Sequence, residues 1–137
     1  MRRSTKQTSP MPMATWPELD DLIWLFETNP VVEYEDLGYP VAATTFVTVR
    51  GTTEVECTIE PFMNSISITL SESGQERMRL HLWGLIDGLV LDRTHDREAL
   101  VATINGDAGF HELRLEMKPS PRVSWSSIAP WAPGARM

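Results

Sequence analysis

Cysteines and long apolar segments are scarce in this chain of 137 residues, and their scarcity excludes several classes of protein. Cys57 is the only cysteine, so intramolecular disulfides and thiolate metal clusters are excluded. The longest apolar stretches, such as residues 22–26, are far shorter than the ~20 residues that cross a bilayer. Polar residues and prolines stand near the N-terminus where a signal peptide would need an apolar segment. We therefore expect a cytoplasmic protein with no membrane partner.

Motifs for catalysis and for metal or phosphate binding are also missing. The sequence has no glycine-rich phosphate loop and no nucleophile elbow. His81, His95 and His111 do not stand at metal-ligand spacings from one another. Cys57 alternates in phase with Val55 and Ile59, so we expect it to be a small buried side chain rather than a nucleophile. The sequence predicts no catalytic site, no metal and no cofactor.

Basic residues are nearly absent from one third of the chain. Residues 14–60 contain ten acidic residues and a single basic one, Arg50, so this segment carries a net charge of −9, within a total of −7. Such a surface repels phosphate backbones, so we expect no nucleic-acid partner. It suits a basic protein partner, although an acidic surface also serves solubility alone.

One segment near the N-terminus has helical periodicity. Residues 15–28 begin with a capping box, Thr15 to Glu18, and stop at Asn29-Pro30. Their apolar stripe consists of Trp16, Leu19, Leu22, Ile23 and Phe26.

After Pro30 the apolar period changes to two. The candidate strands are 31–36, 41–50, 54–60, 65–71, 77–83, 89–92, 100–104, 113–118 and 123–125. Most connections have hairpin length, which favours antiparallel pairing. The charged segment 92–98 alternates acids and bases, and we expect a self-neutralising loop there. We predict an α+β, mostly β fold: an N-terminal helix packed on an antiparallel meander, as a sandwich or an open barrel. The predicted domain covers 14–126, between a disordered leader (1–13) and an irregular tail (127–137).

Several phrases of the second half resemble a known class of protein. Ser65-Ile-Ser-Ile-Thr-Leu is followed by Arg77-Met-Arg-Leu-His-Leu-Trp-Gly-Leu and Leu89-Val-Leu-Asp, and the pattern ends with Leu113-Arg-Leu-Glu-Met-Lys-Pro and Val123-Ser-Trp. This is similar to small β-rich bacterial immunity proteins of polymorphic or contact-dependent toxin systems. The resemblance implies a non-enzymatic inhibitor of one cognate toxin, with acidic or aromatic residues at the interface.

The acidic segment supplies candidate binding residues. Asp20 and Asp21 point away from the apolar stripe of the helix, and Trp24 lies outside that stripe in a chain with five tryptophans. Because tryptophan is enriched in binding hot spots, Trp24 is a candidate anchor. The predicted partner-binding residues are Asp20, Asp21, Trp24, Glu27, Glu33, Glu35 and Asp36.

Three functions remain open at this point. The first is an immunity-type protein that occludes a basic toxin or enzyme. The second is a small-ligand-binding barrel, or an enzyme built on one, and a filled interior would argue against it. The third is a structural or assembly protein that self-associates through the helix or the sheet edges.

Overall fold

The computed structural model describes residues 15–94, 97–105 and 111–126, which form one α-helix, one 3-10 turn and nine strands. The predicted leader and tail lie outside these residues. The elements are α1 (Leu19–Phe26), β1 (Val31–Val32), β2 (Thr44–Arg50), β3 (Thr53–Glu60), η1 (Pro61–Met63), β4 (Ser65–Glu72), β5 (Gln75–Trp83), β6 (Ile86–Thr94), β7 (Arg97–Ile104), β8 (Glu112–Lys118) and β9 (Arg122–Ser126).

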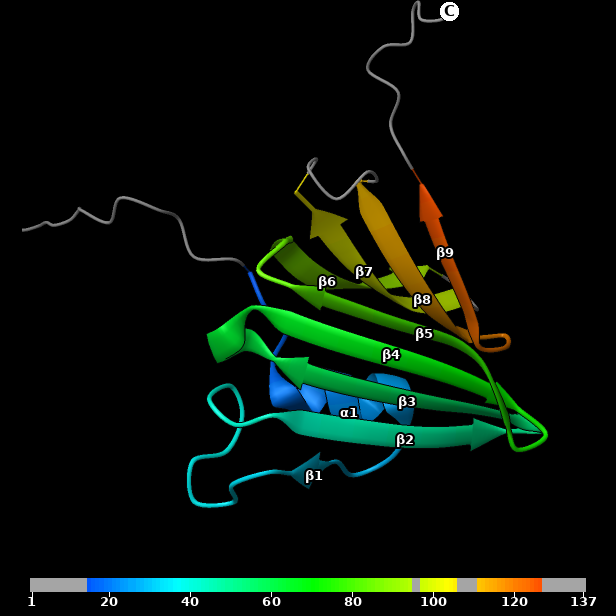
Figure 1. Cartoon of the computed structure of the whole chain (residues 1–137), viewed down its shortest axis with the longest axis horizontal. Helices are drawn as coiled ribbons and strands as arrows, with labels where there is room; N and C mark the ends of the chain where they lie inside the picture. The colour runs from blue at the N-terminus through cyan, green and yellow to red at the C-terminus, as the bar shows by residue number, and fades with distance from the viewer. Residues whose placement is uncertain (1–14, 95–96, 106–110, 127–137) are drawn as a thin grey trace, which may run out of the picture.

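The strands form two antiparallel sheets. β1 to β5 make the larger sheet and β6 to β9 the smaller one, and within each sheet every strand pairs with its neighbours in the chain. This confirms the predicted α+β, mostly β meander. Figure 1 shows the two sheets one above the other, and neither closes into a barrel. Of the two predicted forms, a sandwich and an open barrel, the chain has the sandwich of two separate sheets.

Both sheets contribute to a single core. In β3 the apolar residues Val55, Cys57 and Ile59 are fully buried and alternate with more exposed polar ones, as strands with one solvated face do. The core joins them to side chains from the smaller sheet, including Leu100 and Leu115. The space between the sheets is therefore filled with side chains, which argues against a ligand-binding barrel.

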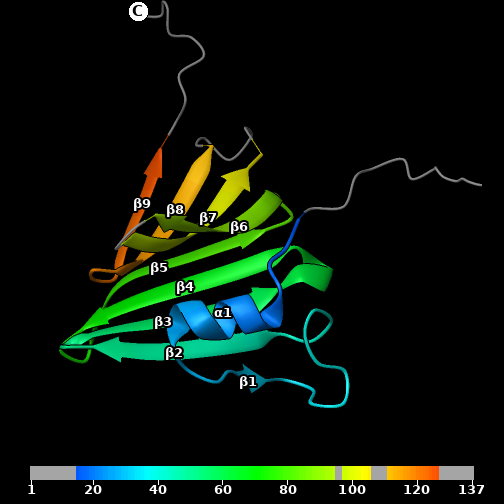
Figure 2. The ribbon, with the colours of Figure 1, turned by 180° about the vertical axis from the view of Figure 1, so that it is seen from behind.

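The helix covers part of the same face of the larger sheet. Figure 2 shows α1 lying against this sheet, and it contacts β2 and β7. The Phe26 ring stacks on Phe46, with the centroids 4.8 Å apart. The buried Thr48 hydroxyl donates a hydrogen bond of 2.8 Å to the Phe26 carbonyl, so a carbonyl at the helix C-terminus has a partner. Within the described ranges, no helix is long and apolar enough to span a bilayer.

The predicted start of the helix is wrong. α1 begins at Leu19, its N-cap is Glu18, and no side chain caps it. Thr15 instead forms a parallel bridge with Gly88, and its carbonyl accepts a hydrogen bond of 2.7 Å from the Leu89 amide. The backbone of Thr15 is used to pair with the edge of β6, which keeps it extended and unavailable for a capping box.

The charged segment 92–98 also differs from its prediction. Most of it belongs to strands, because β6 runs to Thr94 and β7 starts at Arg97. Its charges pair with distant residues: Arg93 with Asp21 at 2.9 Å, and Asp92 with Arg114. In the β6–β7 ladder Arg93 stands opposite Glu98, but the ion pairs of Asp92 and Arg93 reach β8 and α1 instead.

Replacing Cys57 by serine is expected to lower the free energy of unfolding by about 1–3 kcal/mol, because a hydroxyl is left in an apolar core. The thiol is fully buried, and burial raises its pKa well above the ordinary value. Chemical denaturation of the wild type, Cys57→Ser and Cys57→Ala measures the effect. Equal stability of the serine and alanine variants would show that the hydroxyl finds a partner.

Candidate functional site

The connections between the strands of the larger sheet gather at two opposite ends. We call one the loop end: residues 33–43, 60–64 and 83–88, which join β1 to β2, β3 to β4 and β5 to β6. The Phe62 amide donates a hydrogen bond of 3.3 Å to the Pro40 carbonyl, so two of these connections touch. The β2–β3 and β4–β5 turns lie at the other end, where the Ser73 amide bonds the Thr52 carbonyl at 2.8 Å. Figure 1 shows the loop end on the left and the hairpin turns on the right.

Asn64 holds the connections of the loop end together. Its side-chain amide donates to the Ile86 carbonyl and its side-chain carbonyl accepts from the Ile86 amide, both at 2.9 Å. Its backbone carbonyl also accepts a hydrogen bond of 2.7 Å from Gly84. Asn64 has a φ of 52°, in the left-handed region that asparagine tolerates better than most residues. The backbone that carries Phe62, Met63 and Trp83 is therefore fixed by one asparagine.

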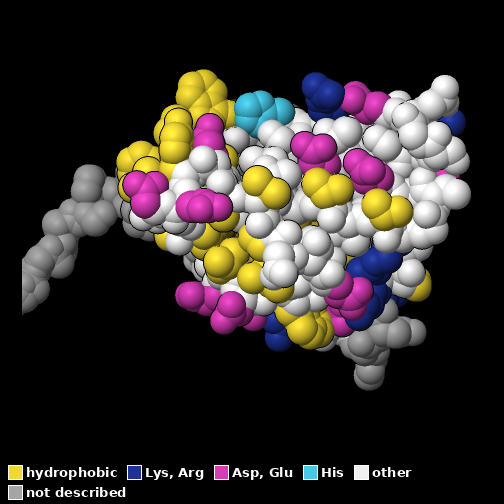
Figure 3. Space-filling view, turned by 90° about the horizontal axis from the view of Figure 1, so that it is seen from below, with side chains coloured by type: hydrophobic (Ala, Val, Ile, Leu, Met, Phe, Trp, Pro, Cys, Tyr) yellow, Lys and Arg dark blue, Asp and Glu magenta, His cyan; other side chains and the backbone are white. Residues whose placement is uncertain are grey.

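Large apolar side chains are exposed at this end. Phe62 is 74% exposed and Trp83 65% exposed. Four more exposed apolar side chains belong to the loop end: Tyr34, Leu37, Val41 and Met63. Figure 3, seen from the side of β1 and β2, shows hydrophobic side chains gathered at the left end among carboxylates. Gathered apolar side chains with a polar surround mark interaction surfaces.

The same end is acidic and carries no base. Its segments contain neither lysine nor arginine. They contain five carboxylates: Glu33, Glu35, Asp36, Glu60 and Asp87. The ion pairs of the described residues involve Asp21, Glu27, Glu76, Asp92, Glu98 and Glu116. None of the loop-end acids takes part in one of those pairs. Within the described part of the chain, the negative field of this end is therefore not neutralised by ion pairs with cations.

The structure separates the seven predicted partner-binding residues into two groups. Glu33, Glu35 and Asp36 are exposed in the β1–β2 connection of the loop end. Asp20 is exposed in the first turn of α1. That turn lies near the loop end, because the Tyr39 hydroxyl donates a hydrogen bond of 2.6 Å to the Pro17 carbonyl.

Asp21, Trp24 and Glu27 form the second group, and cations of the protein itself engage all three. Asp21 pairs with Arg93, whose guanidinium stands 4.2 Å from the centroid of the Trp24 ring. Lys118 lies 5.9 Å from the same ring and pairs with Glu27 at 3.1 Å. The hydrogen bonds that the Lys118 ammonium donates to the Glu27 and Glu98 carboxylates hold the pKa of Lys118 above its ordinary value. This network ties α1 to the smaller sheet.

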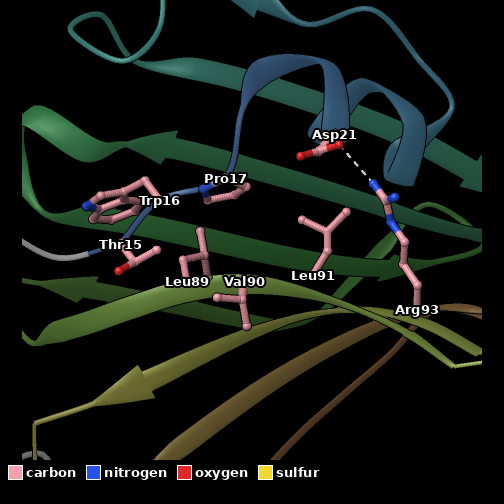
Figure 4. A pocket seen from close by; sticks show the side chains of 8 residues that line it. All are labelled: Thr15, Trp16, Pro17, Asp21, Leu89, Val90, Leu91 and Arg93. Carbon is pink, nitrogen blue, oxygen red and sulfur yellow. Dashed lines mark hydrogen bonds and ion pairs between the residues drawn. The ribbon is translucent and has the colours of Figure 1, made fainter.

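A hollow lies beside that network, between the segment before α1 and β6. Thr15, Trp16 and Pro17 line one side of it, and Leu89, Val90 and Leu91 line the other. Figure 4 shows the ion pair between Asp21 and Arg93 closing one end. The hollow has a volume of about 330 Å³. The remaining lining is largely apolar, so this place is a packing seam between the helix segment and the sheet.

The outer face of the larger sheet is hollowed along β4. The small residues Ser67 and Thr69 line this part of the face, between longer side chains of β3 and β5. Two adjoining hollows of about 530 and 500 Å³ share Thr58, Ser67 and His81. The second of them reaches the loop end. Across the described residues, no group of three or more histidine, cysteine or acidic side chains is placed to hold a metal ion.

Sequence reasoning missed Phe62, Met63 and Trp83 as surface residues. A signal for Trp83 was present, because it is in phase with Arg77, Arg79 and His81 on the polar face of its strand. Phe62 and Met63 follow the proline that ends β3, where a turn leaves both side chains in solvent.

Comparisons with known proteins support the fold resemblance predicted from the sequence. No protein-family model matches the chain, and no curated protein matches its sequence. A chain in the solved structure of a contact-dependent growth inhibition toxin–immunity protein complex from Klebsiella pneumoniae 342 has a similar fold, with a TM-score of 0.71 and 15% sequence identity. The match covers 86% of this chain and 100% of that one. The chain described here therefore shares its fold with a component of a toxin–immunity complex.

Proposed function

We propose that this protein is an immunity-type inhibitor that binds a cognate basic toxin domain through the loop end. The observation that carries the proposal is the coincidence of exposed aromatic side chains with unneutralised carboxylates on one end of the molecule. The fold it shares with a component of a toxin–immunity complex supports the same role.

The inhibitor would act by occlusion. Carboxylates of the β1–β2 connection, Glu33, Glu35 and Asp36, attract a cationic surface of the toxin over a long range. Phe62 and Trp83 then contribute the buried apolar contact that slows dissociation of the complex. A toxin whose basic cleft is filled in this way is kept from its substrate.

A protection assay tests this function. Bacteria that express a toxin domain encoded beside the gene of this protein are expected to grow only when the protein is co-expressed. A Phe62→Ala/Trp83→Ala double variant that reaches the same cellular level is expected to lose protection. Failure of the wild type to protect, together with no binding between the purified proteins, would contradict the proposal.

Charge reversal at the loop end is expected to slow association with the toxin. In Glu35→Lys/Asp36→Lys we expect the association rate constant to fall about tenfold at low salt, because electrostatic steering is lost. The difference should shrink at high salt, since the Debye length falls to about 3 Å at 1 M. Stopped-flow kinetics at two salt concentrations measures this. The matched control is Glu54→Lys/Glu56→Lys, which reverses the same number of charges at two exposed acids of β3 outside the loop end, and an equal loss there would show that only total charge matters.

The helix residues have a separate test. If Asp20, Asp21 and Trp24 contact the toxin as predicted, Asp20→Lys/Asp21→Lys slows association and Trp24→Ala speeds dissociation. The loop-end proposal expects the smaller effects here, because Asp21 and Trp24 are already engaged by Arg93. Kinetic effects as large as those of the loop-end variants would move the interface onto α1.

A further inference from the structure

The hollow nearest the loop end is lined by a carboxylate, a hydroxyl and an indole ring. Ser65 pairs with Glu60 on one side and with Trp83 on the other, so the three side chains form one row across the outer face. Because neighbouring strands lie about 4.8 Å apart, Glu60 and Trp83 stand about 10 Å from each other with a serine between them. Met63 and His81 also line this hollow of about 500 Å³.

The charge of the hollow selects the ligand. Glu60 is the only carboxylate among the described residues of its lining, and it takes part in none of their ion pairs. Among the residues that the structure describes, no lysine or arginine lines the hollow, and the His81 Nε2 lies 3.1 Å from the Ser65 hydroxyl. A cation is therefore favoured and an anion is not.

The side chains that line the hollow favour a planar cation. The face of an indole attracts cations, and a guanidinium also stacks on it. Its fork of N–H donors meets a carboxylate with two hydrogen bonds and leaves donors for hydroxyl groups such as Ser65 and Thr58. A lysine ammonium is a point charge on a flexible stem. It would form an ion pair with the carboxylate but would not stack on the indole ring.

We infer that this hollow is the pocket for one arginine side chain of the partner protein, stacked on Trp83 and paired with Glu60. The inference rests on the proposed function, since it names the residue that the partner presents. It places the specific contact beside the exposed Phe62, at the edge of the acidic field.

The pocket is testable without the partner. The full chain, labelled with ¹⁵N, is titrated with N-acetyl-L-arginine amide and followed by NMR. We expect saturable shifts of the Trp83 indole N–H and of the Ser65 and Ser67 amides. The control ligand is N-acetyl-L-citrulline amide, which has nearly the same shape without the charge, and it should cause no such shifts.

Two variants decide the assignment. Glu60→Gln is expected to weaken arginine amide binding by about fivefold, as the loss of an exposed ion pair does, whereas the matched variant Glu54→Gln, outside the hollow, leaves it unchanged. Equal shifts with citrulline amide, or an unchanged affinity in Glu60→Gln, would overturn the pocket. The protection assay separates this failure from that of the proposed function. A protein that protects bacteria but binds no arginine amide still inhibits the toxin, so only the pocket would be wrong.

Discussion

Trp83→Ala is expected to weaken toxin binding by about 30-fold or more, the consequence of losing a hot-spot contact of about 2 kcal/mol. The side chain is 65% exposed in the free protein, so most of its surface is available to a partner. The effect should fall on the dissociation rate, because a short-range apolar contact forms after the encounter. Surface plasmon resonance with the immobilised toxin domain measures both rates.

The control for this prediction is Trp125→Ala. Trp125 is also exposed, at 59%, but it belongs to β9 in the smaller sheet. We expect its replacement to leave the affinity within a factor of about two. Thermal unfolding of both variants checks that each is folded. An equal loss of affinity in the two variants would mean that the partner covers both sheets.

Phe26→Ala should produce the largest loss of stability, about 3–5 kcal/mol, because it leaves a cavity in the core. Phe26 is fully buried and stacks on Phe46, and its carbonyl accepts the hydrogen bond of Thr48. Single domains are stable by about 5–15 kcal/mol, so this one substitution removes a large share of the free energy of unfolding. Urea denaturation followed by far-ultraviolet circular dichroism measures the change.

The same helix offers the matched control for that prediction. Trp24 is 45% exposed, and the cations of Arg93 and Lys118 lie over its ring. Its replacement by alanine is expected to cost about 1 kcal/mol, in the range of a partly exposed cation–π contact. A loss in Trp24→Ala as large as in Phe26→Ala would show that the charged network, rather than the core, fastens α1 to the sheets.

The sequence was sufficient for most of the architecture. Apolar alternation located the strands, because a strand with one solvated face repeats every two residues, as Val55, Cys57 and Ile59 do. The hairpin-length connections then predicted antiparallel neighbours. The start of α1 could not be predicted in the same way, because the extended backbone of Thr15 depends on pairing with Leu89, far away in the sequence.

The candidate site was predictable only in part. The acids Glu33, Glu35 and Asp36 follow from local charge, and their exposure in a connection is expected. That Asp21 and Glu27 would meet Arg93, Arg50 and Lys118 depends on how the helix lies on the sheets, which no local pattern contains. The periodicity of β5 does place Trp83 on the outer face, but only the register with β4 puts it opposite Glu60.

At the loop end, the residue that fixes the backbone is different from the residues that present the exposed apolar side chains. Asn64 fixes the backbone through hydrogen bonds to Ile86 and Gly84, while Phe62, Met63 and Trp83 contribute little to the core. Such side chains can be exchanged at little cost in folding free energy, because surface substitutions usually change it by less than about 0.5 kcal/mol. The proposed recognition surface is thus free to diversify under selection by a changing partner, whereas position 64 is not.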